Sequence, residues 1–444
     1  MDLQGHFDLG NELFFNKEYE RAVTQYDIVL SVYSDNYIVF HNKGVALTKL
    51  GRMQEAIEAF QMPMAAGYAD SWLSYGTVAR NLGKYQEALQ AFAKAFALDP
   101  DSSAAYSNYG NTLREFSRPD IAIPFLHLSN KLNPKDMTTR LNLSVSYLMN
   151  EELVKGWKYY DARWFYESEI CFKPALEGIE FDGTQDLENR IVLVYSEQGL
   201  GDCIQFGRYL NVLQDKGAKI IFSCRPPLLR FFNHNYPDIT LTSGELLPYH
   251  YHVPLMELPK CFGTTIDTIP PVNYTVGSDV IEKWKAKLEP TSKKRVGIVW
   301  KSNRDNFINR FKTIELETML KLKNSNVEFF SLEYECTEAE TELLQDYNVK
   351  VYGKTLGDFY SAGGFIKNLD LVITIDTASA HLAASLGVPT WTLLPDYAPD
   401  WRWFVNRNDS PFYPSMRLFR RQKNGSWENL IDTVNLELEN FVRT

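Results

Sequence analysis

The first 165 residues carry a repeating pattern of small and large positions. A small residue returns at intervals of about 34 residues, and a second small residue follows it each time after twelve positions. The first set is Gly10, Gly44, Gly76, Gly110 and Ser144, and the second is Ala22, Ala56, Ala88, Ala122 and Gly156. Because antiparallel helices approach closely only where their side chains are small, residues 1–165 are predicted to form about five stacked helix pairs, the fifth degenerate.

Beyond residue 187 the pattern changes to short apolar runs, rich in β-branched residues and separated by helical segments. These runs are 191–195, 219–224, 296–300, 327–332, 371–375 and 388–394. Continuous apolar runs are typical of buried parallel strands, and strands that alternate with helices build right-handed βαβ units. The pattern therefore predicts a connector at 166–187 and then two Rossmann-like α/β domains, at 188–278 and 279–425. Residues 426–444 are predicted to form a closing helix.

The segment 371–386 joins a buried strand directly to a helix. Asp376 stands at the expected N-cap, and the following residues have apolar positions at helical spacing. The first N–H groups of a helix have no partner within it and carry the positive end of its dipole. This helix start therefore predicts an anion site that suits a diphosphate. Thr377 and Ser379 add hydroxyl donors, and His381 follows about one turn along.

The run DTASAHLAASLGVPTWTLLP, followed by PDWRWF and SPFYPSMRLFR, resembles the C-terminal half of bacterial GT-B glycosyltransferases. It is most similar to the tetratricopeptide-repeat glycosyltransferases related to the heptosyltransferases of glycosyltransferase family nine, and the N-terminal repeats match them too. The resemblance implies an α + α/β architecture, with a tetratricopeptide array at 1–165 and a GT-B module of two Rossmann-like domains. In that module 188–278 is the acceptor side, 279–425 binds the nucleotide sugar, and 426–444 returns toward the first domain.

The same resemblance assigns the Asp-Thr-(small)-x-x-His element to the diphosphate of a nucleotide-sugar donor. The donor-binding residues that it implies are Thr377, Ala378, Ser379 and His381. His381 would donate to the leaving phosphate, and a buried structural histidine is the alternative. Asp376 is given a supporting role, capping or orienting Thr377, because a carboxylate repels a diphosphate.

The loop after the strand at 296–300 is a second candidate for donor binding. Relatives read Trp-Ser-Gly-Asn here, whereas this chain reads Trp-Lys-Ser-Asn, so Asn303 matches and the loop shape differs. Lys301 is added on charge alone, because its cation would neutralise a diphosphate. Arg310 takes the place of an arginine found in the relatives, with an ordinary surface arginine as the alternative. Asp400 and the aromatic run that follows it are expected to pack, and to form a donor-side wall.

The turn SEQGLGD carries the candidate catalytic base. Gly199 and Gly201 allow a tight turn and a close approach to a ligand. The resemblance makes Asp202 the base that takes the proton of the acceptor hydroxyl, and the alternative is a plain N-cap of the helix that follows. Glu197 is the rival carboxylate of this turn, and Gln198 is assigned to contact with donor or acceptor.

Composition narrows the classes of function. The 444 residues include 46 basic and 56 acidic side chains, and the formal charge of −10 disfavours a nucleic-acid binder. Five scattered cysteines without a C-x-x-C pair predict a reducing compartment and no zinc site. The N-terminus lacks the features of a signal peptide, and no apolar run approaches ~18 residues. A cytoplasmic protein with no membrane span and no metal cofactor is expected.

Together these features predict a glycosyltransferase that moves a sugar from a nucleotide-sugar donor to an acceptor hydroxyl, without a metal and with inversion. Fused repeats favour a protein acceptor docked on their concave surface. Bracing of the enzyme or homo-oligomerisation is the alternative role for the repeats. A glycan or lipid acceptor is the alternative within the enzyme class. A repeat scaffold that binds nucleotide sugars without turnover is the alternative from another class.

Overall fold

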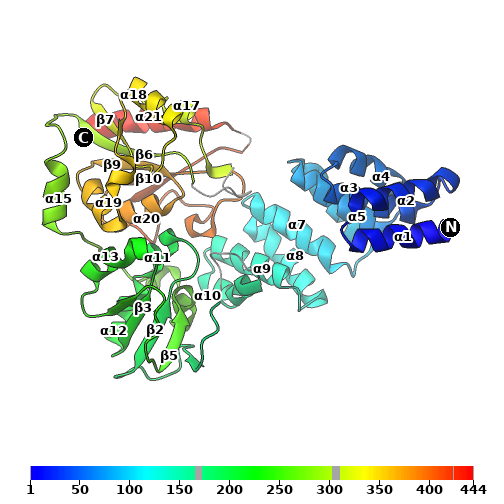
Figure 1. The fold of residues 1–444 in the computed structure, drawn as a ribbon, viewed down its shortest axis with the longest axis horizontal. Helices are drawn as coiled ribbons and strands as arrows, with labels where there is room; N and C mark the ends of the chain where they lie inside the picture. Colours follow the sequence, from blue (N-terminus) through cyan, green and yellow to red (C-terminus); the bar gives the residue numbers. More distant parts are fainter. Residues whose placement is uncertain (1, 166–172, 303–310, 424, 444) are drawn as a thin grey trace. The chain divides into compact units, whose positions relative to one another are not determined.

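The computed structural model describes residues 2–165, 173–302, 311–423 and 425–443. It divides into two compact units, Met1–Ser146 and Tyr147–Thr444. The first unit is helical, and the second contains two parallel sheets with helices packed around them (Figure 1). These elements confirm the predicted α + α/β class.

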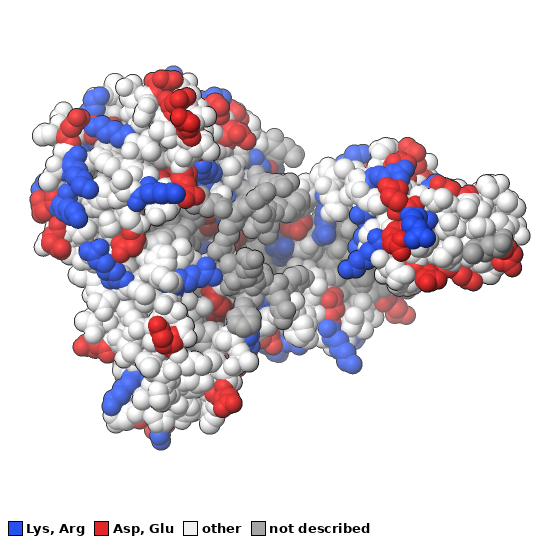
Figure 2. Space-filling view, viewed as in Figure 1, with Lys and Arg blue, Asp and Glu red and all other residues white. Residues whose placement is uncertain are grey.

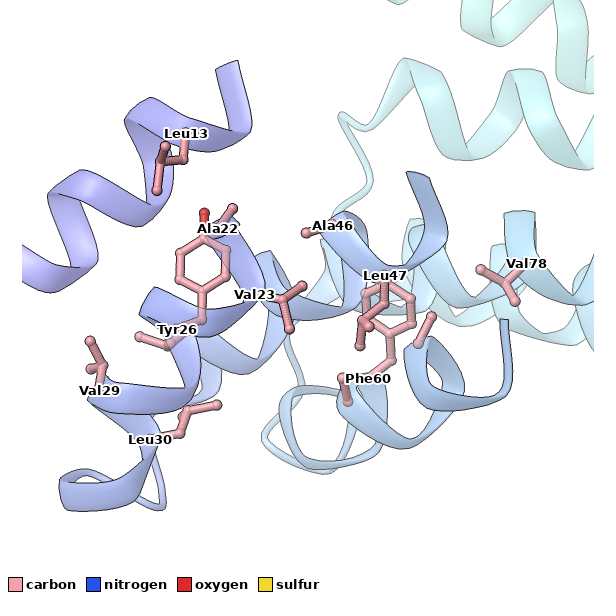
Figure 3. Close-up of a cluster of buried hydrophobic side chains, with 13 residues drawn as sticks. Leu13, Ala22, Val23, Tyr26, Val29, Leu30, Ala46, Leu47, Phe60 and Val78 are labelled. Carbon is pink, nitrogen blue, oxygen red and sulfur yellow. The ribbon is translucent and has the colours of Figure 1, made fainter. Parts of the chain in front are cut away.

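The N-terminal repeats consist of helix pairs in which small residues face large ones. The helices are α1 (Leu3–Phe15), α2 (Tyr19–Val32), α3 (Tyr37–Lys49), α4 (Met53–Ala65), α5 (Ala69–Asn81), α6 (Tyr85–Leu98), α7 (Ser103–Glu115), α8 (Pro119–Leu132) and α9 (Met137–Met149). A Cβ added to Gly10 would lie 2.7 Å from the ring of Tyr26, and one added to Gly44 would lie 2.6 Å from Phe60. Figure 3 shows these two rings among the buried side chains of the first repeats. The small positions are therefore required by the packing of each pair.

The last helical segment groups with the second unit. It comprises α10 (Leu153–Trp157) and η1 (Tyr160–Phe165). Trp157 is buried, with its ring centroid 5.3 Å from that of Trp401 and 6.4 Å from that of Phe206. The sequence assigned all of 1–165 to the repeats, whereas these aromatic contacts join residues 147–165 to the α/β part of the chain.

The first sheet of the second unit has five parallel strands in the order β1-β5-β2-β3-β4. Its strands are β1 (Ile179–Glu180), β2 (Ile191–Tyr195), β3 (Lys219–Ser223), β4 (Thr240–Thr242) and β5 (Tyr251–Pro254). The helices that follow its strands are α11 (Leu200–Phe206), α12 (Tyr209–Asp215), α13 (Pro226–Asn235), η2 (Leu255–Glu257), α14 (Leu258–Cys261) and η3 (Ile266–Thr268). Because β2 lies in the middle of the sheet, it is an almost continuous apolar run, as parallel sheets require.

The second sheet has six parallel strands in the order β11-β10-β9-β6-β7-β8. Its strands are β6 (Lys294–Val299), β7 (Val327–Ser331), β8 (Lys350–Val351), β9 (Leu371–Ile375), β10 (Thr390–Leu394) and β11 (Met416–Arg420). Its helices are α15 (Ser278–Lys285), α17 (Leu316–Met319), α18 (Glu338–Asp346), η4 (Gly353–Leu356), α19 (Phe359–Ile366), α20 (Ala378–Ser385), η5 (Trp401–Trp403) and α21 (Trp427–Arg443).

The C-terminal helix α21 packs on the second sheet. The Thr318 hydroxyl donates to the carboxylate of Glu428 at 2.9 Å, and the rings of Trp391 and Phe441 lie 5.8 Å apart. The sequence predicted that residues 426–444 return toward the first α/β domain. The structure places α21 against α17 and β11 of the second α/β domain instead, and the buried apolar side chains of α21 face that second domain.

On the face shown in Figure 2, basic and acidic side chains lie interspersed. Within the described ranges, no helix is both long enough and apolar enough to cross a bilayer.

Candidate functional site

A cavity of about 790 Å³ lies at the carboxyl ends of both sheets. Its lining comes from the segments that follow β2 and β3 of the first sheet and β6, β7, β8, β9 and β10 of the second. Helices α11 and α20, one from each α/β domain, lie side by side between the sheets (Figure 1). Parallel α/β sheets bind their ligands at this edge, and the volume suits a nucleotide-sized ligand.

The start of α20 forms one wall of the cavity. Thr377 is the N-cap of this helix, with an extended backbone (φ −144°, ψ 171°), and Ala378 and Ser379 also line the cavity. The predicted N-cap, Asp376, is therefore displaced by one residue, since the strand runs to Ile375 and the helix begins at Ala378. The first N–H groups of α20 lie at this wall, and the anion site predicted there stays a prediction.

Asp376 contacts Lys312, a residue that the sequence analysis did not assign to the site. Its Oδ2 lies 3.4 Å from Nζ of Lys312, and both residues line the cavity. Lys301, which was chosen for its charge, has a different partner, because its Nζ lies 2.7 and 2.6 Å from the two carboxylate oxygens of Glu340. The sequence does hold a signal for Lys312, because it is the basic residue that opens the segment KTIEL, two positions after the predicted donor-binding residue Arg310. Asn303 and Arg310 lie outside the described residues.

Asp202 faces the cavity from α11. The helix begins at Leu200, so Asp202 is its third residue and is not an N-cap. Its Oδ2 accepts the N–H of Gly199 at 2.7 Å, and its Oδ1 accepts a hydrogen bond from Arg402. Arg402 was expected to belong to a packing run. Its guanidinium also lines the cavity, as the predicted wall position allows, and it pairs with Asp400 at 2.9 Å.

Glu197, the rival carboxylate, points away from the cavity. Its side chain is fully buried, and its Oε1 accepts from Arg163 at 3.1 Å and from the N–H of Met256 at 3.1 Å. Burial raises the pKa of Glu197, and the charge of Arg163 opposes that rise. Gln198 lines the cavity, and its amide nitrogen lies 3.3 Å from the hydroxyl of Tyr160. Only Asp202 of the two acidic residues in this turn is placed for contact with a bound substrate.

His381 belongs both to the cavity lining and to a packed cluster. Its Nδ1 lies 2.9 Å from the hydroxyl of Tyr413, and its ring stacks on Trp403 with centroids 5.2 Å apart. Burial, reinforced by the positive charge of Arg402, lowers the pKa of His381 to about 3. The imidazole is therefore neutral at neutral pH, and with Nδ1 held by Tyr413 it retains Nε2 for contacts in the cavity.

Gly201 allows α11 to approach α20. A Cβ built on Gly201 would lie 2.7 Å from Cδ2 of His381 and 3.3 Å from Cα of Ala378. The sequence analysis assigned Gly201 to close approach by a ligand. In the structure it is helix α20 that approaches Gly201 this closely. The contact places Asp202, the next residue, beside the start of α20.

Gly201→Ala is expected to destabilise the protein by about 1–3 kcal/mol, because the new methyl group meets a histidine that Trp403 and Tyr413 hold in place. The measurement is the midpoint of thermal unfolding. Gly199→Ala serves as the control, since its Cβ would meet only Oδ2 of Asp202, at 3.0 Å. Equal shifts for the two variants would show that α11 and α20 do not approach this closely.

Glu333 adds a buried carboxyl to the cavity. It follows β7, is 4% exposed, and accepts the N–H groups of Trp300 at 3.2 Å and Lys301 at 3.1 Å. Burial raises the pKa of Glu333 from 4.5 to about 7, against the effect of these two hydrogen bonds. The sequence analysis did not single out this residue.

Glu333→Gln is expected to change the pH dependence of stability. Between pH 4.5 and 7 the native protein holds a proton on Glu333 that the unfolded chain releases, so the wild type loses stability as pH rises. Between pH ~5 and ~8 this loss is about 2.5 kcal/mol, and the glutamine variant lacks the titrating group and does not lose it. Unfolding measured at both pH values should show the variant gaining on the wild type.

The control for this measurement is Glu340→Gln. Although burial of Glu340 opposes it, the hydrogen bond from Lys301 lowers the pKa of Glu340, so this carboxyl is ionised throughout that pH range. Its stability difference from the wild type should vary far less with pH, since burial raises the pKa of Glu333 much more than the charge of Glu340 does. A constant difference for Glu333→Gln would contradict the prediction.

Comparison with known proteins identifies the class. Residues 7–69 and 69–102 match tetratricopeptide repeat families, and residues 308–402 match glycosyltransferase family 9 (heptosyltransferase). The chain therefore combines tetratricopeptide repeats with a family 9 glycosyltransferase domain, which confirms the resemblance drawn from the sequence. The family 9 match supports glycosyltransferase activity.

One relative aligns with most of the chain. Protein FlbA of Caulobacter vibrioides is 25% identical over 437 residues, which cover 90% of this chain and 72% of FlbA. Among solved structures, MamA is 18% identical and covers 39% of this chain and 98% of its own, with a TM-score of 0.33. YrrB, described as a TPR protein with an unusual peptide-binding site, is 23% identical. The match covers 36% of this chain and 84% of YrrB, with a TM-score of 0.31.

Proposed function

We propose that this protein transfers a sugar from a nucleoside-diphosphate sugar to an acceptor hydroxyl, with inversion at the anomeric carbon and without a metal ion. The observation that carries the proposal is the cavity in which a carboxylate on α11 lies beside the start of α20. Sugar transfer needs a base for the acceptor hydroxyl and a stabilised diphosphate leaving group. Asp202 supplies the first requirement and the helix start at Thr377 supplies the second.

In this mechanism a carboxylate oxygen of Asp202 takes the proton of the acceptor hydroxyl. The hydroxyl oxygen then forms a bond to the anomeric carbon, from the face opposite the leaving group. The bond between that carbon and the phosphate oxygen breaks, and its electron pair leaves with the diphosphate. The N–H groups of Ala378 and Ser379, the Thr377 hydroxyl and the ammonium of Lys312 stabilise the developing charge.

Lys312→Ala is expected to weaken binding of a nucleoside diphosphate by about ten- to a hundredfold, because a charged hydrogen bond to a phosphate oxygen is lost. The measurement is calorimetric titration of the protein with UDP, GDP, ADP and CDP. Lys301→Ala is the matched control, since its ammonium lies 2.7 and 2.6 Å from the two oxygens of Glu340, whereas Lys312 has one longer contact, at 3.4 Å, with Asp376. An equal or larger effect of Lys301→Ala would assign the phosphate contact to Lys301 rather than to Lys312.

A protein is the proposed acceptor, and the tetratricopeptide repeats are its proposed docking surface, because solenoids of this kind present extended concave faces. We place the activity in the cytoplasm, where the thiols of Cys203, Cys224, Cys261 and Cys336 stay reduced as the structure has them. Sugar incorporated into glycan or lipid fractions, and not into protein, would assign a different acceptor.

The test of the donor is a thermal-shift panel with UDP-, GDP-, ADP-, CMP- and dTDP-linked sugars, each with and without EDTA. A donor at about 100 times its dissociation constant stabilises the native state by about 2.7 kcal/mol. A response that EDTA leaves unchanged supports metal-independent donor binding. Binding with neither release of free nucleotide nor transfer of the sugar to an added acceptor would favour a repeat scaffold that holds nucleotide sugars without turnover.

A further inference from the structure

Arg402 joins the candidate base to the opposite side of the cavity. One of its Nη atoms donates to Oδ1 of Asp202, and the other donates to both carboxylate oxygens of Asp400, at 2.9 and 3.1 Å. Asp202 follows β2 of the first sheet, and Arg402 follows β10 of the second. A single guanidinium therefore connects the two α/β domains at the point where the acceptor hydroxyl would react.

The guanidinium is anchored independently of Asp202. Asp400 holds its side chain with two hydrogen bonds and also accepts the backbone N–H of Arg402 at 2.9 Å. The ring of Trp401 lies 4.5 Å from the guanidinium carbon and that of Phe206 lies 5.8 Å from it. Arg402 is 5% exposed. Because these contacts fix the planar fork without help from Asp202, the fork provides a fixed donor for Oδ1 of that carboxylate.

Asp202 is held at both oxygens and still faces the cavity. Gly199 donates to Oδ2 at 2.7 Å, Arg402 donates to Oδ1, and 18% of the Asp202 side chain is exposed. An ionised carboxylate offers about four lone-pair sites, so two of them are left for a hydroxyl. The carboxylate is therefore oriented before an acceptor arrives.

We propose that Arg402 is the positioning residue of this site: it fixes the Asp202 carboxylate across the cavity so that a remaining lone pair meets the acceptor hydroxyl. This inference rests on the proposed function, in which Asp202 is the base. Arg402 itself exchanges no proton. Although its burial acts in the opposite direction, the charges of Asp202 and Asp400 raise the pKa of Arg402, and the guanidinium stays protonated throughout.

The test is Arg402→Lys, assayed as hydrolysis of the nucleotide sugar that gives the largest response in the thermal-shift panel, with water in place of the acceptor. Lysine keeps the positive charge, but a single ammonium has no planar fork to join two carboxylates. The kcat should fall about 10²-fold with KM unchanged, since misplacement of a reacting group costs turnover and leaves binding intact. Thermal unfolding of the variant reports whether it folds.

Arg407→Lys is the matched control. Arg407 joins Asp409, at 3.0 and 2.7 Å, to Glu151 at 3.0 Å, which is the same bridging pattern, and it is not among the residues that line the cavity. Its kcat should equal that of the wild type. An equal loss of kcat in both variants would overturn the assignment.

A second measurement separates positioning from a structural role. In the Asp202→Asn background Arg402→Lys should cause no further loss of the residual kcat, because a residue that acts through Asp202 has nothing left to position. Methylguanidinium added to Arg402→Ala should restore part of the activity. A rise in KM with kcat unchanged would make Arg402 a donor-binding residue and overturn the proposal. A wild-type protein that binds a donor but neither hydrolyses it nor transfers its sugar to any acceptor would instead refute the proposed function.

Discussion

Asp202→Asn is expected to lower the kcat of sugar transfer by about 10²–10⁴-fold while donor binding is retained, because a general base contributes that much and asparagine accepts no proton. The amide is similar in size to the carboxylate, and its oxygen still accepts a hydrogen bond from Arg402 or from the N–H of Gly199. The protein should therefore fold. The measurements are the kcat with the responding nucleotide sugar and its dissociation constant by calorimetric titration.

Glu197→Gln is the control for that experiment. It alters the other acidic residue of the same turn, whose buried carboxylate faces Arg163 and Met256 and does not line the cavity. Its kcat should stay within a few-fold of the wild type, although its stability will change. Loss of turnover in Glu197→Gln with activity kept in Asp202→Asn would exchange the two roles and refute the proposed base.

The strands were predictable because buried parallel strands are apolar runs that need no knowledge of their partners. The runs at 191–195 and 371–375 match β2 and β9 residue for residue. Helix starts were less accurate, since α11 and α20 are capped by Gly199 and Thr377. A cap depends on the local backbone turn, which sequence patterns locate only to within one or two residues.

The partners of the charged residues in the cavity were not predictable. Arg402 stands between two tryptophans in a run that reads as packing, and its contact with Asp202 joins positions 200 residues apart. Lys301 was chosen for its charge, and Lys312 was not singled out. The structure gives Lys301 the carboxylate of Glu340 and leaves Lys312 beside Asp376. Such pairings depend on how the elements assemble, and no spacing rule along the chain contains that information.

Arg163→Met is expected to destabilise the second unit by about 3–5 kcal/mol, because it leaves two carboxylates without their shared cation. The Arg163 side chain is 3% exposed and donates to Glu197 at 3.1 Å and to Glu257 at 3.0 Å. Glu257 keeps a second cation, Lys260, at 2.6 Å. Glu197 has no such substitute among the described residues, so it carries most of the cost. The measurement is differential scanning calorimetry of the full chain.

A double variant identifies the cause of that loss. Arg163→Met with Glu197→Gln removes the unpaired buried carboxylate, so it should recover a large part of the stability even though the ion pair is absent.

Arg417→Met is the matched exposed control. Arg417 is 48% exposed in its pair with Glu437, and its replacement should cost about 0–1 kcal/mol. If the double variant were as unstable as Arg163→Met alone, the loss would come from the packing of Arg163 on Tyr160 and Trp164 rather than from the buried carboxylate. The distinction matters for the site, because Glu197 begins the turn that carries Asp202, and a cation that holds Glu197 in the interior also holds that turn in place.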